Sequence, residues 1–299
     1  MNKRPSKWWD NLKKLIALFY MNYFLMNVIR RILNFMRITP SSGVTESKAS
    51  AKIKKSDTLE LTSIGSPETT NPEIMIEETY TPEMSSNYHY LIDNGHGGWI
   101  IDEEHPEGYY PTAGKRSPKD PDTGEVVIYE GVNNRINAKL IVDELTRMRI
   151  SASLLVPEEE DISLKERIQR ANNEHSQRKC VIISIHSNAA GSDGKWANAK
   201  GISLHIAKNR SKTTDQLVTI MEEEFKHDFN ELTKWRGVKI NDFFMTRKSH
   251  SPSILCEIGF HDCLIEAKKM KTDQWRMLLV KSISHAIITF EDSTPKVRS

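Results

Sequence analysis

The sequence predicts an α/β domain with a mainly parallel or mixed central sheet and helices on both faces, preceded by an apolar N-terminal helix and a disordered linker. Three observations lead to this prediction. From about residue 87 onward, short apolar runs alternate with segments of helical periodicity. Residues 179–188, KCVIISIHSN, form a continuous apolar run, which is typical of a central strand covered on both faces. Residues 40–86 show no sustained period.

The N-terminal segment, residues 1–39, is both basic and apolar. It holds eight Lys or Arg and one Asp around an uncharged run at residues 15–29. That run is shorter than the ~20 apolar residues of a spanning helix, but its apolar flanks extend it, so we expect membrane contact through residues 8–38. If the helix spans, its basic excess places the N-terminus in the cytoplasm and the remaining chain outside. The polar positions also lie close to one helical stripe, which fits a surface-lying or partner-docking helix. A helix packed on the main domain is the remaining alternative.

The linker, residues 40–86, is rich in Ser, Thr, Pro and Glu and holds four Lys and eight acidic residues. Such a composition is typical of a disordered tether, with a reach on the order of 35–40 Å. The remaining chain carries thirty basic and thirty-one acidic residues. This near-neutral balance argues against a nucleic-acid-binding protein, which would carry a basic face on its folded part.

The folded domain is predicted to cover residues 87–292, followed by a tail at 293–299. Its expected strands are residues 87–95, 150–157, 179–188, 201–207, 241–247 and 252–260. Its expected helices are residues 132–148, 161–175, 211–232, 264–271 and 273–290. Ser163 and Glu166 have the spacing of a capping box at the start of the second helix. The three cysteines form no CxxC pair, so we expect buried core thiols rather than a disulfide or a thiolate metal site.

Four residues carry the chemistry: His96 in LIDNGHGG, Glu130 in YEGVNNRI, His186 in IISIHSN and Glu257 in SILCEIGF. All but Glu130 lie at or after an apolar strand, and sites form at the carboxyl ends of strands in open α/β sheets. Glu130 opens a helix. Two imidazoles and one carboxylate are ordinary Zn²⁺ ligands that leave one position open. We therefore expect His96, Glu130 and His186 to bind Zn²⁺ and Glu257 to serve as the catalytic base.

Residues 88–290 resemble the zinc-dependent N-acetylmuramoyl-L-alanine amidases of the Amidase_3 type, which include phage endolysins. The matching pieces are LIDNGHGG, the helix start at Glu130, LKERIQRAN, IISIHSNA, KGISLHI and PSILCEIGF. The resemblance implies the same roles for the four residues named above. It also implies cleavage of the amide between N-acetylmuramic acid and L-alanine in peptidoglycan. From the basic N-terminus we expect a membrane-associated protein with its catalytic domain on the periplasmic or extracellular side, or a phage-encoded lysin acting there.

The chain departs from this family in the long connection at residues 97–129, which we expect to act as a lid or a wall of the substrate groove. Lys115 and Arg116 in that connection are candidates for binding peptide carboxylates, although a solvated turn is the simpler interpretation. His261 follows Glu257 closely and is a candidate support for the site, although a surface or core residue is the simpler interpretation. Arg167 is expected to pack or pair structurally rather than to act in catalysis. Two other functions stay open: a cell-wall-binding or virion or membrane structural protein without catalysis, and a zinc peptidase acting within the stem peptide.

Overall fold

The computed structural model describes residues 86–191 and 194–295. The predicted N-terminal helix and the linker lie outside these residues. Within them, no helix is both long and apolar enough to cross a membrane.

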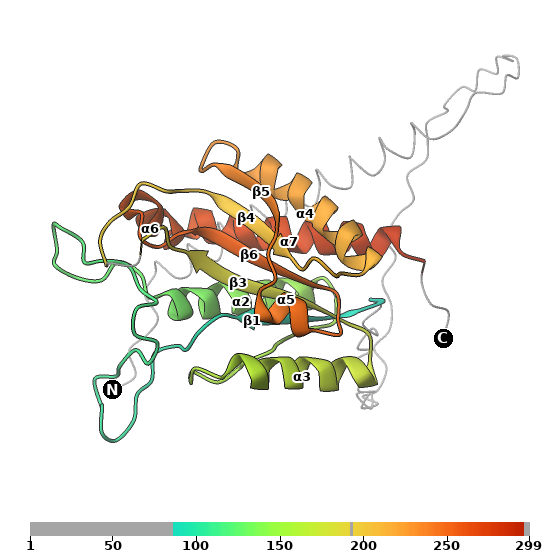
Figure 1. The fold of residues 1–299 in the computed structure, drawn as a ribbon, viewed down its shortest axis with the longest axis horizontal. Coiled ribbons are helices and arrows are strands. Elements are labelled where there is room, and N and C mark those ends of the chain that lie inside the picture. The colour runs from blue at the N-terminus through green and yellow to red at the C-terminus, as the bar shows by residue number, and fades with distance from the viewer. Residues whose placement is uncertain (1–85, 192–193, 296–299) are drawn as a thin grey trace, which may run out of the picture. The chain divides into compact units, whose positions relative to one another are not determined.

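A six-stranded sheet in the order β2-β1-β3-β6-β4-β5 forms the centre of the domain (Figure 1). The strands are β1 (His89–Asn94), β2 (Ala152–Leu154), β3 (Cys180–Asn188), β4 (Ile202–Ile206), β5 (Trp235–Ile240) and β6 (Ser253–Phe260). Neighbouring strands pair in parallel except β4 and β6, which pair antiparallel. The sheet is therefore mixed, as predicted.

Helices cover both faces of the sheet (Figure 1). They are α2 (Glu130–Arg147), α3 (Leu164–Gln177), α4 (Lys212–Phe229), α5 (Phe244–Lys248), α6 (Leu264–Met270) and α7 (Asp273–Ser293). Along β3, Ile183 belongs to the hydrophobic cluster that includes residues of α2, α4 and α7, whereas Ile182 belongs to the cluster that includes residues of α3 and α5. This alternation follows from the two-residue period of a strand, and it explains the continuous apolar run of the sequence.

Helix α3 begins where its cap predicts. The Ser163 hydroxyl accepts a hydrogen bond from the Glu166 amide at 3.2 Å, which satisfies one of the free N–H groups of the first turn. The Glu166 carboxylate instead pairs with Arg170 at 3.0 Å, so the cap is made from one side. The cap sets where the loop before α3 ends, and that loop borders the site described below.

One predicted strand is wrong. Residues 244–247 of this predicted strand belong to the helix α5, and the strand in this part of the sheet is β5, Trp235–Ile240. A short apolar run fits a strand and a buried helix turn equally well, and the Thr246 hydroxyl donates to the Phe243 carbonyl at 3.1 Å, inside a helical turn. Strand β5 lies at the sheet edge and contains Gly237 at φ +90°, so its sequence lacks a clear strand pattern.

Candidate metal centre

Three neighbouring strands and one helix start position the candidate residues. His96 lies two residues after β1, and Glu130 is the first residue of α2. His186 lies near the end of β3, and Glu257 of β6 is its register partner. Because β3 and β6 run parallel, these two side chains stand on the same face of the sheet, one strand apart.

The side chains of His96, Glu130 and His186 converge. Glu130 Oε1 lies 3.3 Å from His96 Nε2 and 3.2 Å from His186 Nδ1. The two imidazole rings are 5.0 Å apart and nearly perpendicular. One ligand atom from each residue lies within 4.8 Å of the others, close enough for a single ion to contact all three.

The surroundings of Glu130 fit a metal ligand. The side chain is 1% exposed, and its Oε2 atom has no hydrogen-bond partner in the described part of the chain. A buried, unpaired carboxylate oxygen costs free energy unless it is paired or coordinates a metal. Two imidazoles and a carboxylate match the catalytic zinc sites with three protein ligands, so the residues present fit Zn²⁺.

Charge interactions within this group hold the carboxylate ionised. Burial raises the pKa of Glu130, but the hydrogen-bonding imidazoles of His186 and His96 outweigh it and bring that pKa well below its ordinary value. For His186, burial lowers the pKa, and the bond to Glu130 more than reverses this. A metal ion would replace the protons that these rings share with the carboxylate.

Glu257 has different surroundings. Burial raises its pKa to about 7, the nearby His186 opposes the rise, and the Glu130 carboxylate adds to it. Its Oε2 atom also has no hydrogen-bond partner among the described residues. Glu130 is thus held as an anion, whereas the pKa of Glu257 lies close to neutral pH, which suits a group that transfers protons.

Two further residues, Ser187 and His261, lie against Glu130. The Ser187 amide donates to Glu130 Oε1 at 3.1 Å. His261 Nδ1 donates to the Ser187 carbonyl at 3.1 Å and lies 3.7 Å from Glu130 Oε2. His261 therefore lies beside the site, as its position in the sequence suggested, whereas the Ser187 contact comes from a backbone group that no side-chain pattern reveals.

Arg167 makes the structural pairing expected of it. It is 2% exposed, and its Nη1 donates to Asp93 Oδ1 at 2.6 Å. The other Asp93 oxygen accepts from the Ser184 hydroxyl at 2.7 Å. This buried network joins α3 to β1 and β3 directly below the loop that carries His96.

Two cavities border the centre. One of about 300 Å³ is lined by His96, His186 and the residues that begin α3. Another of about 320 Å³ lies between His261 and the 97–129 connection, whose Arg116 and Lys119 line it. The connection therefore lines a cavity beside His261, and its role as a lid or a wall of the substrate groove stays a prediction.

Comparisons with known proteins agree with this geometry. Residues 91–289 match the family model described as N-acetylmuramoyl-L-alanine amidase. An uncharacterized cell wall amidase of Bacillus anthracis is 29% identical over 206 residues, which are 67% of this chain and 35% of that protein. The uncharacterized protein YqiI of Bacillus subtilis is 24% identical over 132 residues, 44% of this chain and 59% of that protein. The chain thus spans about a third of the first relative and less than two thirds of the second.

Solved structures show the same fold. An N-acetylmuramoyl-L-alanine amidase from Clostridium difficile 630 superposes with a TM-score of 0.56 at 25% identity, covering 71% of this chain and all of that one. The catalytic domain of CwlV, an amidase of Bacillus (Paenibacillus) polymyxa var. colistinus, gives 0.53 at 19% identity, covering 69% and 99%. With more than half of its length matched by the family model, the chain belongs to the N-acetylmuramoyl-L-alanine amidase family.

Proposed function

We propose that this protein hydrolyses the amide bond between N-acetylmuramic acid and L-alanine in peptidoglycan, with Zn²⁺ as its cofactor. The observation that carries the proposal is the convergence of His96, Glu130 and His186 within 4.8 Å, with Glu257 on the neighbouring strand. Membership of the amidase family supports the choice of bond.

The residues divide the work according to their surroundings. His96, Glu130 and His186 would hold Zn²⁺, which polarises a carbonyl and makes a water molecule more acidic. Glu257 takes a proton from the attacking water, whose oxygen bonds to the carbonyl carbon. The same carboxyl group then gives that proton to the alanine nitrogen as the C–N bond breaks. A pKa near 7 allows Glu257 to act in both directions at neutral pH.

Mass spectrometry of a peptidoglycan digest tests the bond that is cut. The purified full-length protein should release stem peptides with a free alanine amine and leave N-acetylmuramic acid with a free carboxyl group. A chelator should abolish the products, and added Zn²⁺ should restore them. Sugars that keep part of the stem peptide would indicate a peptidase instead, and binding to the wall without metal or product would indicate a non-catalytic wall protein.

We further propose that residues 8–38 contact a membrane and that the domain works on its periplasmic or extracellular side. The uncharged run at residues 15–29 between basic flanks supports membrane contact. This segment lies outside the described residues. Deleting residues 1–39 should move the protein from the membrane to the soluble fraction, and an unchanged membrane fraction would refute the contact.

The side of the membrane needs a separate measurement. The cysteines of the chain, Cys180, Cys256 and Cys263, are all buried, so an introduced surface thiol serves as a specific label site. Lys139 has a 69% exposed side chain on α2, and Lys139→Cys in intact cells should react with a membrane-impermeant maleimide. Labelling only after cell lysis would place the domain in the cytoplasm and refute the proposed location.

A further inference from the structure

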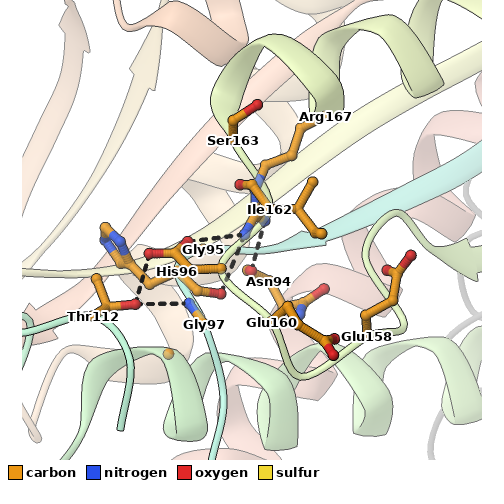
Figure 2. Close-up of polar contacts among 12 residues, drawn as sticks. Asn94, Gly95, His96, Gly97, Thr112, Glu158, Glu160, Ile162, Ser163 and Arg167 are labelled. Atoms are coloured by element: carbon orange, nitrogen blue, oxygen red, sulfur yellow. Dashed lines mark hydrogen bonds and ion pairs between the residues drawn. The ribbon is translucent and has the colours of Figure 1, made fainter. Parts of the chain in front are cut away.

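The loop after β1 is held by side chains from two helices. Three successive carbonyl groups, those of Asn94, Gly95 and His96, each accept a hydrogen bond from a side chain. Arg167 Nη1 donates to the Asn94 carbonyl at 2.8 Å, and Asn134 Nδ2 donates to the Gly95 carbonyl at 3.1 Å. Figure 2 shows the Arg167 side chain reaching this loop from α3. The backbone that presents His96 is therefore fixed from outside the sheet.

The His96 carbonyl accepts from two guanidinium groups at once. Arg135 Nη1 donates to it at 2.6 Å and Arg167 Nη2 at 3.2 Å. Arg135 is itself anchored, because its Nε and Nη2 donate to the Glu158 carbonyl at 3.1 and 2.6 Å. Arg167 is anchored by Asp93. Because both guanidinium groups are anchored by these other contacts, neither can move with the His96 carbonyl if the loop changes conformation.

His96 needs such support, because its backbone has φ +69°. This left-handed conformation is unfavourable for a residue with a side chain, because the Cβ atom crowds the following carbonyl oxygen. Strained residues of this kind persist where the surrounding structure over-determines them, and they concentrate at functional sites. In the observed conformation His96 Nε2 lies 3.3 Å from Glu130 Oε1. A return to negative φ would turn the imidazole away from that carboxylate.

We infer that Arg135 and Arg167 are positioning residues, which hold the His96 carbonyl so that its imidazole is aimed at the metal site. The inference rests on the proposed function, since it assigns the two arginines to the binding of Zn²⁺ by His96. Neither arginine contacts the ion or the substrate in this scheme. Their contribution is to the affinity and geometry of metal binding.

Arg135 is the better residue to test. Its ion-pair partner, Glu159, has a 56% exposed side chain, so removing the guanidinium leaves a solvated carboxylate. Removing Arg167 would leave Asp93 buried without its ion-pair partner, and the resulting loss of stability would obscure any effect on metal binding. Arg135→Met removes the donors and keeps the aliphatic stem, whereas Arg135→Lys keeps the charge but presents one nitrogen in place of the guanidinium fork.

Arg170→Met is a matched control. Arg170 lies on α3 and binds the carboxylates of Glu158 and Glu166 at 2.8 and 3.0 Å, so its loss perturbs the same region through surface ion pairs. All variants are made in the full-length chain. Thermal unfolding of the metal-free proteins measures folding, chelator competition measures the Zn²⁺ dissociation constant, and the visible spectrum of the Co²⁺ form reports coordination geometry.

Arg135→Met should weaken Zn²⁺ binding by about 10–100-fold, the range found when groups that orient metal ligands are removed, and should alter the Co²⁺ spectrum. Arg135→Lys should fall between it and the wild type, and it takes over the test if Arg135→Met does not fold. Arg170→Met should stay within threefold of the wild type. Unchanged affinity and spectrum in the folded Arg135 variants would overturn the inference alone. A wild-type protein that binds no Zn²⁺ would overturn the proposed function and the inference with it.

Discussion

Gly95→Ala tests how tightly the backbone approaches the metal centre. A Cβ atom at position 95 would lie 2.2 Å from His186 Cε1 and 2.4 Å from Nε2, whereas ordinary van der Waals contact begins near 3.4 Å. The Gly95 N–H donates to the Ile185 carbonyl at 3.1 Å, and the Gly95 carbonyl accepts from the side-chain amide of Asn134 at 3.1 Å. The loop is therefore held, and the His186 ring has to move by about 1 Å. Functional constellations tolerate displacements of about 0.5 Å.

The substitution should therefore damage metal binding more than folding. Overpacking costs about 1–3 kcal/mol of stability, while a displaced ligand should weaken Zn²⁺ binding roughly 100-fold or more. Chelator competition measures the loss of Zn²⁺ affinity, and urea unfolding of the metal-free protein measures the loss of stability. Gly97→Ala is the control, because its Cβ would meet Pro111 and Asp161 at 2.8 and 3.0 Å and neither is a proposed ligand. If Gly95→Ala binds Zn²⁺ within threefold of the wild type, the close approach does not set the position of the His186 ring.

Three further predictions concern single groups. Glu257→Gln should lower turnover by about 10²–10⁴-fold while Zn²⁺ stoichiometry stays that of the wild type, and intact turnover would remove Glu257 from the mechanism. Burial, aided by the charge of Arg178, lowers the pKa of His89 to about 4 in the folded protein. Since the unfolded chain takes up a proton at His89 below pH 6.5 and the folded protein only near pH 4, the free energy of unfolding should fall by up to about 3 kcal/mol between pH 6.5 and pH 4. Unfolding free energies of His89→Gln should decline less over this window, and parallel curves would contradict the assignment. Arg167→Met should cost about 3–5 kcal/mol by leaving Asp93 unpaired, and adding Asp93→Asn should recover part of that loss; strictly additive costs in urea unfolding would show that the pair is not coupled.

The sequence predicted the fold where its patterns were long. The apolar run at residues 179–188 corresponds to β3, and the segments with helical periodicity correspond to α2, α3, α4, α6 and α7. The prediction failed for residues 241–247, where seven residues are too few to separate a strand from a helix turn. The strand that replaces them, β5, lies at the edge of the sheet and has only partly buried residues along most of its length, so it lacks the burial pattern by which strands are identified.

The candidate site was likewise predicted in part from the sequence. Residue chemistry and chain position were enough to select His96, Glu130, His186 and Glu257 as candidates, because the four together supply the ligands and the base that a hydrolytic zinc centre requires. The four residues are separated by up to about 160 positions in the chain, yet parallel strands bring their carboxyl ends to one edge. Local sequence and a general rule of sheet topology are therefore enough to predict which residues come together in the candidate site.

Only the tertiary structure revealed what holds the site in shape. The bond from Arg135 to the His96 carbonyl and the bond from the Ser187 amide to Glu130 involve backbone groups, which every residue possesses and no side-chain pattern can mark. The left-handed backbone of His96 likewise depends on helices that pack over the loop. The sequence by itself determined which groups are candidates for the chemistry, whereas their distances, their pKa values and the support of His96 were decided by long-range packing, because those properties belong to neighbours that only folding brings together.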